Sequence, residues 1–499
     1  MSAYETLEHR FRDISHLEHV QAMLFWDEAT MMPMGGGPAR AEALAALAGV
    51  LHERRAAPEL GDLLADADAS QDGLAPWQRA NLHQMRRNWR QATALPADLV
   101  TASQLAATTC EQTWRRCRPE QDWATVEPLL KNVIRLNREV AVRLGELEGL
   151  APYEALMDSY EEGLRTAFVE EKFRDLRDFL PGFLDQVLER QARAPGLALE
   201  GPFPVERQKG LGMALIKALG FNFEHGRIDV SHHPFCGGVP DDTRITTRYN
   251  ERDFLSALMA ALHETGHALY QQGLPDDWRG QPVGEALGMA MHESQSLLME
   301  MQVCRSKAFL DFAGDSIRNA FDAGTDDPAW SNGNLYKLCT KVERGFIRVD
   351  ADEVTYPLHI ILRFEIERKL CSGKMGVEEI PEAWNEAMRD LLGLSTAGNL
   401  RDGCMQDVHW FAGLLGYFPS YTLGALTAAQ LFAAARNQID GLEQLIARGD
   451  FRPLLEWLRT HVHGRGRLKT APELLKDVTG APLGTEAFKS HLQSRYLAD

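Results

Sequence analysis

Apolar residues recur at every third or fourth position over most of this chain, which is the spacing of an amphipathic helix. The first such stretch runs from Tyr4 to Leu24, and its apolar positions are Leu7, Phe11, Ile14, Leu17, Val20 and Leu24. A Gly- and Pro-rich segment, residues 32–38, then breaks the pattern. The same period returns and predicts further helices over residues 40–51, 76–93, 96–118 and 126–147. Stretches this long predict helical hairpins in the N-terminal part of the chain.

The pattern changes to the alternation of β-strands near the middle of the chain. Residues 227–231 and 244–249 form short, β-branched segments, and the Gly, Pro and Asp residues within 237–242 predict turns between them. Helical periodicity resumes near residue 252 and continues to the end of the sequence. We therefore expect a mainly α fold, with a small sheet of two or more strands beside the helix that follows it.

Length, charge and cysteine usage narrow the class of protein. The chain has 499 residues with 44% apolar content, enough for a large core, and its net charge is −18. Such an acidic chain repels nucleic acid and anionic membrane surfaces, so we expect neither as a partner. We find no secretory signal and no apolar run long enough to span a bilayer. The 7 cysteines are scattered without a C-x-x-C pair, which is typical of reduced thiols in a cytoplasmic protein.

The segment from His263 to His267 reads His-Glu-Thr-Gly-His, an H-E-x-x-H pattern. Histidines four residues apart on a helix differ by about 40° in azimuth and one turn in height, so both imidazoles can bind one divalent ion. Glu264 then lies close enough to take a proton from a water on that ion. The pattern therefore predicts the metal-activated water of a zinc-type metallopeptidase.

The surroundings of the motif place it in the middle of a buried helix. Asn250 is the expected N-cap, with Asp253 three residues on, and Gly273 followed by Pro275 ends the helix. An apolar stripe at helical spacing precedes the motif, at Phe254, Leu255, Leu258, Met259 and Leu262. Because buried histidines need partners, we favour metal binding over two core histidines satisfied by neighbouring polar groups.

A catalytic zinc ion usually has three protein ligands, so one more is needed. The metzincin pattern is excluded because Tyr270 and Gly273 stand where it requires Gly and His. The alternative is a glutamate on a second predicted helix, residues 285–305, which offers Glu285, Glu293 and Glu300. We favour Glu293, which lies mid-helix among apolar neighbours where an unpaired carboxylate is unfavourable. The other two are expected to be solvated surface side chains.

Further motifs follow one another along the chain in a characteristic order. They are His233-Pro234-Phe235, Asp242-Thr243-Arg244-Ile245-Thr246, the H-E-x-x-H pattern, His292-Glu293-Ser294-Gln295, residues 347–352 (Ile-Arg-Val-Asp-Ala-Asp) and residues 403–410 (Gly-Cys-Met-Gln-Asp-Val-His-Trp). With these motifs the chain resembles the carboxypeptidase Taq family of metallocarboxypeptidases. The resemblance runs from Trp26-Asp27 to His463-Gly464, nearly the whole sequence.

The resemblance implies one peptidase unit over residues 1–499, with a mostly helical fold and a long active-site groove. Residues 1–150 would form helical hairpins that cover the groove, and residues 226–430 would form the metal- and substrate-binding core. It also implies a homodimer that releases single residues, with broad specificity, from peptides with a free C-terminus.

For the metal, the resemblance assigns His263, His267 and Glu293 as ligands and Glu264 as general base. We expect one divalent ion per subunit. Zinc is the first choice and cobalt the alternative, because these ligands suit both ions.

For the substrate, the resemblance points to Arg348. A guanidinium forms two parallel hydrogen bonds to a carboxylate, which suits a free C-terminus. The alternative is a structural ion pair with Asp350 or Asp352. His409 and Tyr421 are expected near the scissile bond, where a neutral N–H and a hydroxyl can stabilise an oxyanion; either can instead be structural.

Several other residues are assigned more loosely. Arg244 either lines the groove, where it would bind substrate, or pairs with Asp242. Asp407 is a candidate for orienting a histidine of the site. His233 and His292 are expected to support the site and not to bind the metal.

Two alternative functions remain. A metallo-endopeptidase or oligopeptidase on the same scaffold would share the metal chemistry but would not depend on a free carboxylate. A non-catalytic helical binding protein belongs to another class, and the intact Glu264 argues against it.

Overall fold

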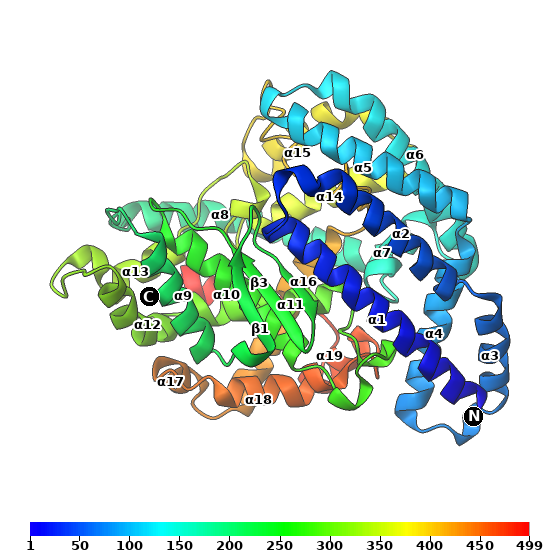
Figure 1. Cartoon of the computed structure of the whole chain (residues 1–499). Coiled ribbons are helices and arrows are strands. Elements are labelled where there is room, and N and C mark those ends of the chain that lie inside the picture. Colours follow the sequence, from blue (N-terminus) through cyan, green and yellow to red (C-terminus); the bar gives the residue numbers. More distant parts are fainter. Residues whose placement is uncertain (499) are drawn as a thin grey trace.

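The computed structural model describes residues 1–498, and helices dominate it (Figure 1). The N-terminal helices are α1 (Ala3–Thr30), α2 (Gly37–Arg55), α3 (Pro58–Ala69), α4 (Pro76–Ala94), α5 (Ala97–Glu120), α6 (Trp123–Glu148), α7 (Pro152–Tyr160) and α8 (Thr166–Arg193). The predicted helices of this part are confirmed, and α3, α7 and α8 are additions. Local signals set their ends: Ser2 caps α1 in a capping box with Glu5, and Gly149 ends α6 at a φ of 68°.

A small sheet follows α9 (Val205–Ala218) and precedes the helix that carries the histidine motif, α10 (Phe254–Gln272). Its strands are β1 (Gly226–Val230), β2 (Cys236–Val239) and β3 (Asp242–Thr247), in the order β1-β3-β2. β3 pairs in parallel with β1 and antiparallel with β2. The Thr247 hydroxyl donates to the Ala257 carbonyl at 3.0 Å, which holds the sheet beside α10 as predicted.

The turn predicted at Gly237 and Gly238 is wrong, because both glycines lie inside strand β2. β2 is an edge strand, where glycine is tolerated, and Gly238 pairs with Thr243 at a φ of 91°. The tight turn of this hairpin consists of Pro240 and Asp241 alone.

The rest of the chain is helical. It comprises α11 (Met289–Leu297), a π-helical segment (Leu298–Cys304), α12 (Lys307–Ala320), α13 (Asn332–Cys339), α14 (Tyr356–Cys371), α15 (Ile380–Leu392), α16 (Pro419–Gln438), α17 (Leu442–Ala447), α18 (Arg452–His461), α19 (Ala471–Thr479) and α20 (Glu486–Tyr496). The helix predicted from residue 285 starts only at Met289 and changes to π-helix at Leu298. None of the helices described is long and apolar enough to cross a membrane.

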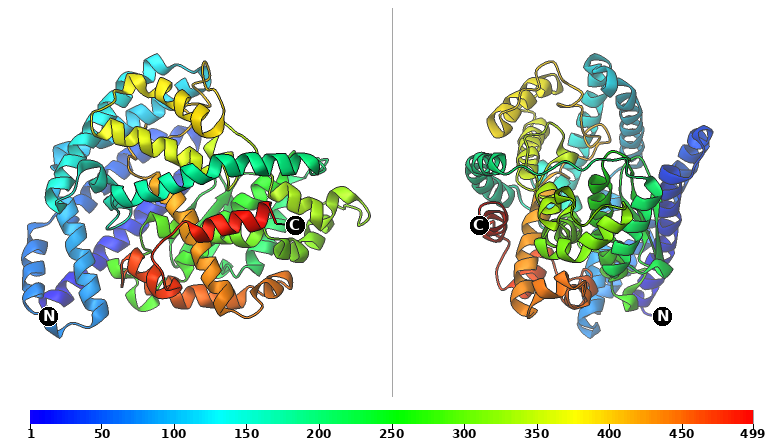
Figure 2. Two further views of the ribbon diagram at one scale, coloured as in Figure 1. Left: turned by 180° about the vertical axis from the view of Figure 1, so that it is seen from behind. Right: turned by 90° about the vertical axis from the view of Figure 1, so that its left-hand side faces the viewer.

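Three hydrophobic cores organise these elements. The first joins α1 to α4. The second lies among α5 to α8, α14, α15, α20 and the loop before α16, and the third among α9 to α13 and α17 to α19 with Ile245 of the sheet. Helix α16 contributes to both of the larger cores, through Leu423 and Leu431 respectively. Figure 1 shows α1 crossing in front of the sheet, and Figure 2 shows α20 on the opposite side of the molecule.

Candidate active site

The histidine motif lies in the second half of α10, which begins one turn later than Asn250 would place it. Asp253 is the N-cap, and its carboxylate accepts from the Ser256 amide at 3.2 Å. Within the motif, Gly266 allows a very close approach of α11, since a Cβ there would lie 2.4 Å from the Gln295 carbonyl oxygen. A larger residue would force the two helices apart, so this glycine fixes how near the histidines come to α11.

The close approach brings His263, His267 and Glu293 together. Their potential ligand atoms all lie within 4.8 Å of one another, and Glu293 Oε2 is 3.4 Å from His267 Nε2 and 3.9 Å from His263 Nε2. Two imidazoles and a carboxylate on packed helices are a donor set that suits a divalent ion such as zinc. Glu285 is not part of this group: it lies in the loop before α11 and pairs with Arg467 at 3.0 Å.

Glu300, expected on the surface, is instead buried beside the first histidine. Its Oε2 lies 2.9 Å from His263 Nδ1, and its Oε1 accepts from Arg305 at 2.7 Å. The π-helical turn in which it stands carries this side chain to the opposite side of the imidazole from Glu293. A carboxylate on Nδ1 fixes the ring and leaves Nε2 for the metal side.

His267 receives a neutral partner instead. Its Nδ1 lies 3.0 Å from the His292 carbonyl oxygen and 2.7 Å from His292 Nδ1. Burial holds the pKa of His292 well below its usual value, so that imidazole is neutral. Its Nε2 is 2.8 Å from the Gln271 side chain. His292 therefore contacts a proposed ligand without belonging to the metal-binding group, in line with the supporting role predicted for it.

Glu264 stands between the two histidines in sequence, and only 7% of it is exposed. Burial raises the pKa of its carboxyl group, while the two neighbouring histidines oppose that shift. A buried carboxylate with a raised pKa can accept a proton at neutral pH, which is what the predicted role requires.

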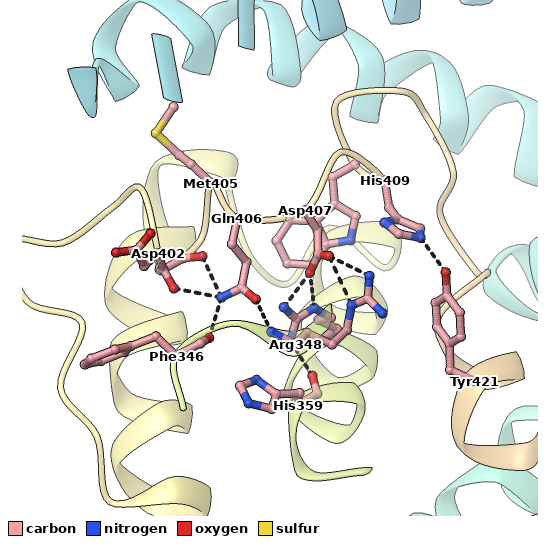
Figure 3. A network of polar contacts seen from close by, with 12 residues as sticks. Phe346, Arg348, His359, Asp402, Met405, Gln406, Asp407, His409 and Tyr421 are labelled. Carbon is pink, nitrogen blue, oxygen red and sulfur yellow. Dashed lines mark hydrogen bonds and ion pairs between the residues drawn. The ribbon is translucent and has the colours of Figure 1, made fainter. Parts of the chain in front are cut away.

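A second polar group centres on Asp407 (Figure 3). Arg348 donates to Asp407 Oδ1 from Nε at 3.0 Å and from Nη2 at 2.8 Å. Arg363 donates to Oδ2 from Nε at 2.7 Å and from Nη2 at 2.5 Å. Burial raises the pKa of the Asp407 carboxyl, but the two guanidinium charges outweigh it and hold that pKa well below its usual range. The structure thus gives Arg348 an ion-pair partner other than Asp350 or Asp352, and Asp407 binds arginines where a histidine was expected.

Gln406 joins the two chain segments that carry this group, as Figure 3 shows. Its Oε1 accepts from the Arg348 amide at 2.8 Å, and its Nε2 donates to the carbonyls of Phe346 at 2.8 Å and Asp402 at 2.7 Å. An amide side chain is suited to this bridge because it donates and accepts at once. The neighbouring Gln and Asp of the motif at residues 403–410 therefore hold the backbone and the side chain of Arg348, respectively.

His409 and Tyr421 form a pair at the edge of this group. His409 Nε2 lies 3.1 Å from the Tyr421 hydroxyl, and the Arg348 guanidinium lies 4.8 Å from the centre of the Tyr421 ring. Burial and the nearby arginine charges lower the pKa of His409 to about 3 against the opposing charge of Asp407, so its ring is neutral. Its Nδ1 has no hydrogen-bond partner within residues 1–498.

Helix α16 links the two groups. A Cβ at Gly424 would lie 2.8 Å from Glu293 Cβ, so α16 packs directly against the glutamate of the metal-binding group. Tyr421 stands three residues earlier, one helical turn away, and lies over Arg348. Helix α16 therefore contacts the metal-binding group at Gly424 and the arginine group at Tyr421, one turn apart.

Arg244 lies apart from both groups. It donates to Asp242 from Nε at 2.8 Å and from Nη2 at 2.7 Å, and its guanidinium stacks 4.3 Å from the Trp26 ring of α1. The pairing with Asp242 that the sequence offered as an alternative is what the structure has. Its contacts place it between the sheet and α1. His233 of the predicted supporting residues is also near the sheet, where its carbonyl lies within hydrogen-bonding reach of the Ser231 hydroxyl.

Arg363 is the residue of the site that the sequence argument missed. It stands in α14 within a short apolar run, residues 360–364 (Ile-Ile-Leu-Arg-Phe), and is fully buried. A lone arginine in such a run signals a buried charge that requires a partner, and this signal was available in the sequence.

Two imidazoles and a carboxylate beside a buried glutamate, on two tightly packed helices, define an H-E-x-x-H metallopeptidase site. The comparison with known proteins agrees. The sequence model of the carboxypeptidase Taq (M32) metallopeptidase family matches residues 6–496. The chain belongs to this family and is a metallocarboxypeptidase, a peptide hydrolase.

Individual relatives are similar over their full lengths. Thermostable carboxypeptidase 1 of Thermus thermophilus is 39% identical over 508 residues, covering 100% of this chain and 99% of the relative. The structure of Trypanosoma cruzi metallocarboxypeptidase 1 superposes with a TM-score of 0.96 at 40% identity, covering 99% of each chain. The apo-Mg structure of Pyrococcus furiosus carboxypeptidase has a TM-score of 0.93 at 32% identity and covers 100% of this chain and 99% of that one. The expected family and the mainly α fold with its small sheet are confirmed.

Proposed function

We propose that this enzyme removes single residues from the free C-termini of peptides, with broad specificity. Glu264 acts as general base and Arg348 binds the terminal carboxylate. The observation that carries the proposal is the pairing of a metal-binding group with a buried arginine group across one turn of α16. An exopeptidase needs both parts, one for hydrolysis and one to select the last peptide bond.

His263, His267 and Glu293 would hold one divalent ion. When bound, such an ion lowers the pKa of a coordinated water and polarises the peptide carbonyl. Zinc suits the nitrogen and carboxylate donors, and cobalt is the alternative. The Glu300 carboxylate and the His292 carbonyl accept from Nδ1 of the two imidazoles, which leaves each Nε2 for the metal side.

The remaining residues divide the proton and charge chemistry among them. Glu264 accepts the proton of the attacking water and passes it to the leaving amine. His409 and Tyr421 supply neutral donors for the oxyanion, and the unpartnered Nδ1 of His409 supports this role. Because burial keeps His409 neutral, it donates a hydrogen bond without adding a charge.

Arg348 can bind a carboxylate only through the part of its guanidinium that Asp407 leaves free. Asp407 takes Nε and one hydrogen of Nη2, whereas Nη1 makes no hydrogen bond within residues 1–498. The Nη1–Nη2 edge still offers two parallel hydrogens, enough for a bidentate contact. Arg244 is the second candidate for substrate contact, through the Nη1 that Asp242 leaves unused.

We further propose that the enzyme works in the cytoplasm as a homodimer, and that helices within residues 1–150 cover the groove formed by the core of residues 226–430. The scattered thiols and the net charge of −18 support a reducing compartment and peptide partners without nucleic acid or membrane.

The test compares a peptide with its C-terminally amidated form, which distinguishes a carboxypeptidase from an endopeptidase. We expect Arg348→Ala to lower kcat/KM on the free peptide by about thirty- to several-thousandfold, because truncating one partner of a buried charged pair typically costs about 2–5 kcal/mol. The preference for free over amidated peptide should shrink with it. Arg244→Ala tests the second candidate, and we expect it to change the preference much less than Arg348→Ala does. If instead Arg244→Ala removes the preference and Arg348→Ala does not, the carboxylate contact lies at the sheet.

A further inference from the structure

Arg363 shares the carboxylate of Asp407 with Arg348, one oxygen each. Arg363, in α14, donates to Oδ2 from both Nε and Nη2. Arg348 donates only to Oδ1, also from Nε and Nη2. Arg363 is also held by the His359 carbonyl, which accepts from Nη1 at 2.6 Å. All three nitrogens of its guanidinium therefore donate hydrogen bonds, and the side chain is fully buried.

The charges of this group do not cancel. Among residues 1–498, Asp407 is the one carboxylate in ion-pair contact with either guanidinium. Burial lowers the pKa of Arg363 to about 10, and it stays protonated at neutral pH. Burial lowers the pKa values of His359 and His409 to about 3 each, so both rings are neutral. Two positive charges and one negative charge leave the group with a net charge of +1.

The acid on α14 that interacts with Arg363, Glu367, does not neutralise the group. Glu367, one turn after Arg363, directs its carboxylate to other donors: the Tyr153 hydroxyl at 2.7 Å, the Trp410 indole at 2.8 Å and the Gly416 amide at 3.0 Å. Burial raises the pKa of Glu367 to about 7, so it carries only part of a negative charge at neutral pH.

Arg363 therefore changes what Arg348 can do. Without it, both oxygens of Asp407 would be free to form a complete fork with Arg348, and the pair would be neutral. A neutral buried pair has little attraction for a second carboxylate. With Arg363 in place, Asp407 orients Arg348 but neutralises only part of the total charge.

We propose that Arg363 is a specificity-determining positioning residue, which occupies half of Asp407 so that Arg348 keeps a net positive charge for the terminal carboxylate of the substrate. This inference rests on the proposed role of Arg348. It predicts that, as long as Arg348 is present, affinity for a carboxylate follows the net charge of the three side chains and not the presence of Arg363 or Asp407 as such.

The experiment varies that charge and measures binding of an N-acetylated amino acid to the metal-free protein by calorimetry, together with KM and kcat of the metal-loaded enzyme. The wild type has a charge of +1 by the count above, and Arg363→Met would have 0. We expect Arg363→Met to weaken the probe and raise KM by about ten- to hundredfold, the range for one hydrogen bond to a charged group, with a smaller change in kcat. The amidated peptide should show no such change.

The double variant Arg363→Met with Asp407→Asn restores a charge of +1 and should recover most of the lost affinity. Arg363→Lys, which keeps the charge, should bind the probe nearly as well as wild type. If Arg363 has only a structural role, the double variant should bind the probe more weakly than either single variant. If Arg363→Met does not fold, Asp407→Asn alone decides: its charge of +2 should tighten probe binding, and weaker binding by the folded variant would overturn the inference.

Arg348→Gln separates this inference from the proposed function. If Arg348→Gln weakens the probe while Arg363→Met binds it like wild type, the charge-sharing role is wrong and the role of Arg348 stands. If Arg348→Gln also binds like wild type, the carboxylate contact itself is wrong.

Discussion

The two halves of the site are held in place by different means. In the metal half, α10 and α11 are close in sequence and in direct contact at Gly266, and each imidazole has its own partner on Nδ1, Glu300 or His292. In the arginine half, two arginines share a single carboxylate, Asp407, which lies 59 and 44 positions further along the chain. The metal half depends on helix geometry, whereas the arginine half depends on a balance of buried charges.

The two halves should therefore respond differently to amino-acid substitutions. When one ligand of the metal half is substituted, the other ligands keep their positions because they stand on packed helices. A change in the arginine half redistributes the partners of Asp407 and alters the net charge of the group. Substitutions should therefore act locally in the first half and collectively in the second.

The largest effect should come from the residue proposed to transfer the proton in the metal half. Glu264→Gln keeps the size of the side chain but cannot accept a proton, so we expect kcat to fall by about 10²- to 10⁴-fold. Metal content, measured by elemental analysis, should stay at the wild-type level, because Glu264 is not among the ligand atoms that converge. A variant that keeps its rate would remove Glu264 from the role of base.

Loss of a metal ligand should instead lower the metal content, and activity should fall with it. Glu293→Ala removes the carboxylate that lies 3.4 Å from His267 Nε2, and we expect metal affinity to fall by more than about a hundredfold. Excess divalent ion should partly recover activity. Glu285→Ala is the matched control, since its exposed carboxylate pairs with Arg467 and lies outside the group. Equal metal binding by wild type and Glu293→Ala would show that the third ligand lies elsewhere.

A smaller effect is expected one step away from the metal. Glu300→Gln keeps an acceptor for His263 Nδ1 but removes the negative charge behind it. Changes to such supporting partners typically cost about 10–100-fold in metal affinity or activity. A competition titration with a chelator measures this directly, with the exposed Glu343→Gln as control. No change in affinity would mean that Arg305, and not the histidine, is the functional partner of Glu300.

The smallest effect on catalysis is expected at a buried acid that holds the start of α11, away from the ligand atoms. Glu161 follows α7 and accepts from the Ala290 amide at 2.9 Å, at the start of α11. Burial raises its pKa to about 7 in the folded state, above the ordinary 4.5. A raised folded pKa adds stability below about pH 4.5 that is lost as the pH rises through 7. Glu161→Gln should therefore gain Tm relative to wild type between pH 5 and pH 8. A difference in Tm that does not change with pH would contradict this.

The metal half could be predicted from sequence because its signals are local. The spacing of His263 and His267 fixes their common face, and the apolar stripe before them fixes burial. The choice of Glu293 also followed from burial. The burial of Glu300 could not be predicted in this way. A π-helical turn shifts its register relative to a regular helix, and no residue pattern in this sequence marked that turn.

The arginine half could not be predicted in the same way. Sequence offered Asp350 and Asp352 as partners for Arg348 because they are near in the chain, but its partner lies 59 positions away. Long-range pairing of this kind depends on how α14 and the loop before α16 pack. Arg363 was recognisable only as a charge in an apolar run, without any indication of which acid it meets.

We expect one metal-dependent site in this enzyme to remove residues singly from a free C-terminus. The most direct measurement is mass spectrometry of one peptide and its amidated form, incubated with enzyme before chelation, after chelation and after re-addition of a divalent ion. We predict a ladder of products that shorten by one residue from the free C-terminus, no ladder after chelation, its return with the ion, and little cleavage of the amidated peptide. Internal fragments, or a ladder that persists in the chelated and metal-free protein, would contradict the account.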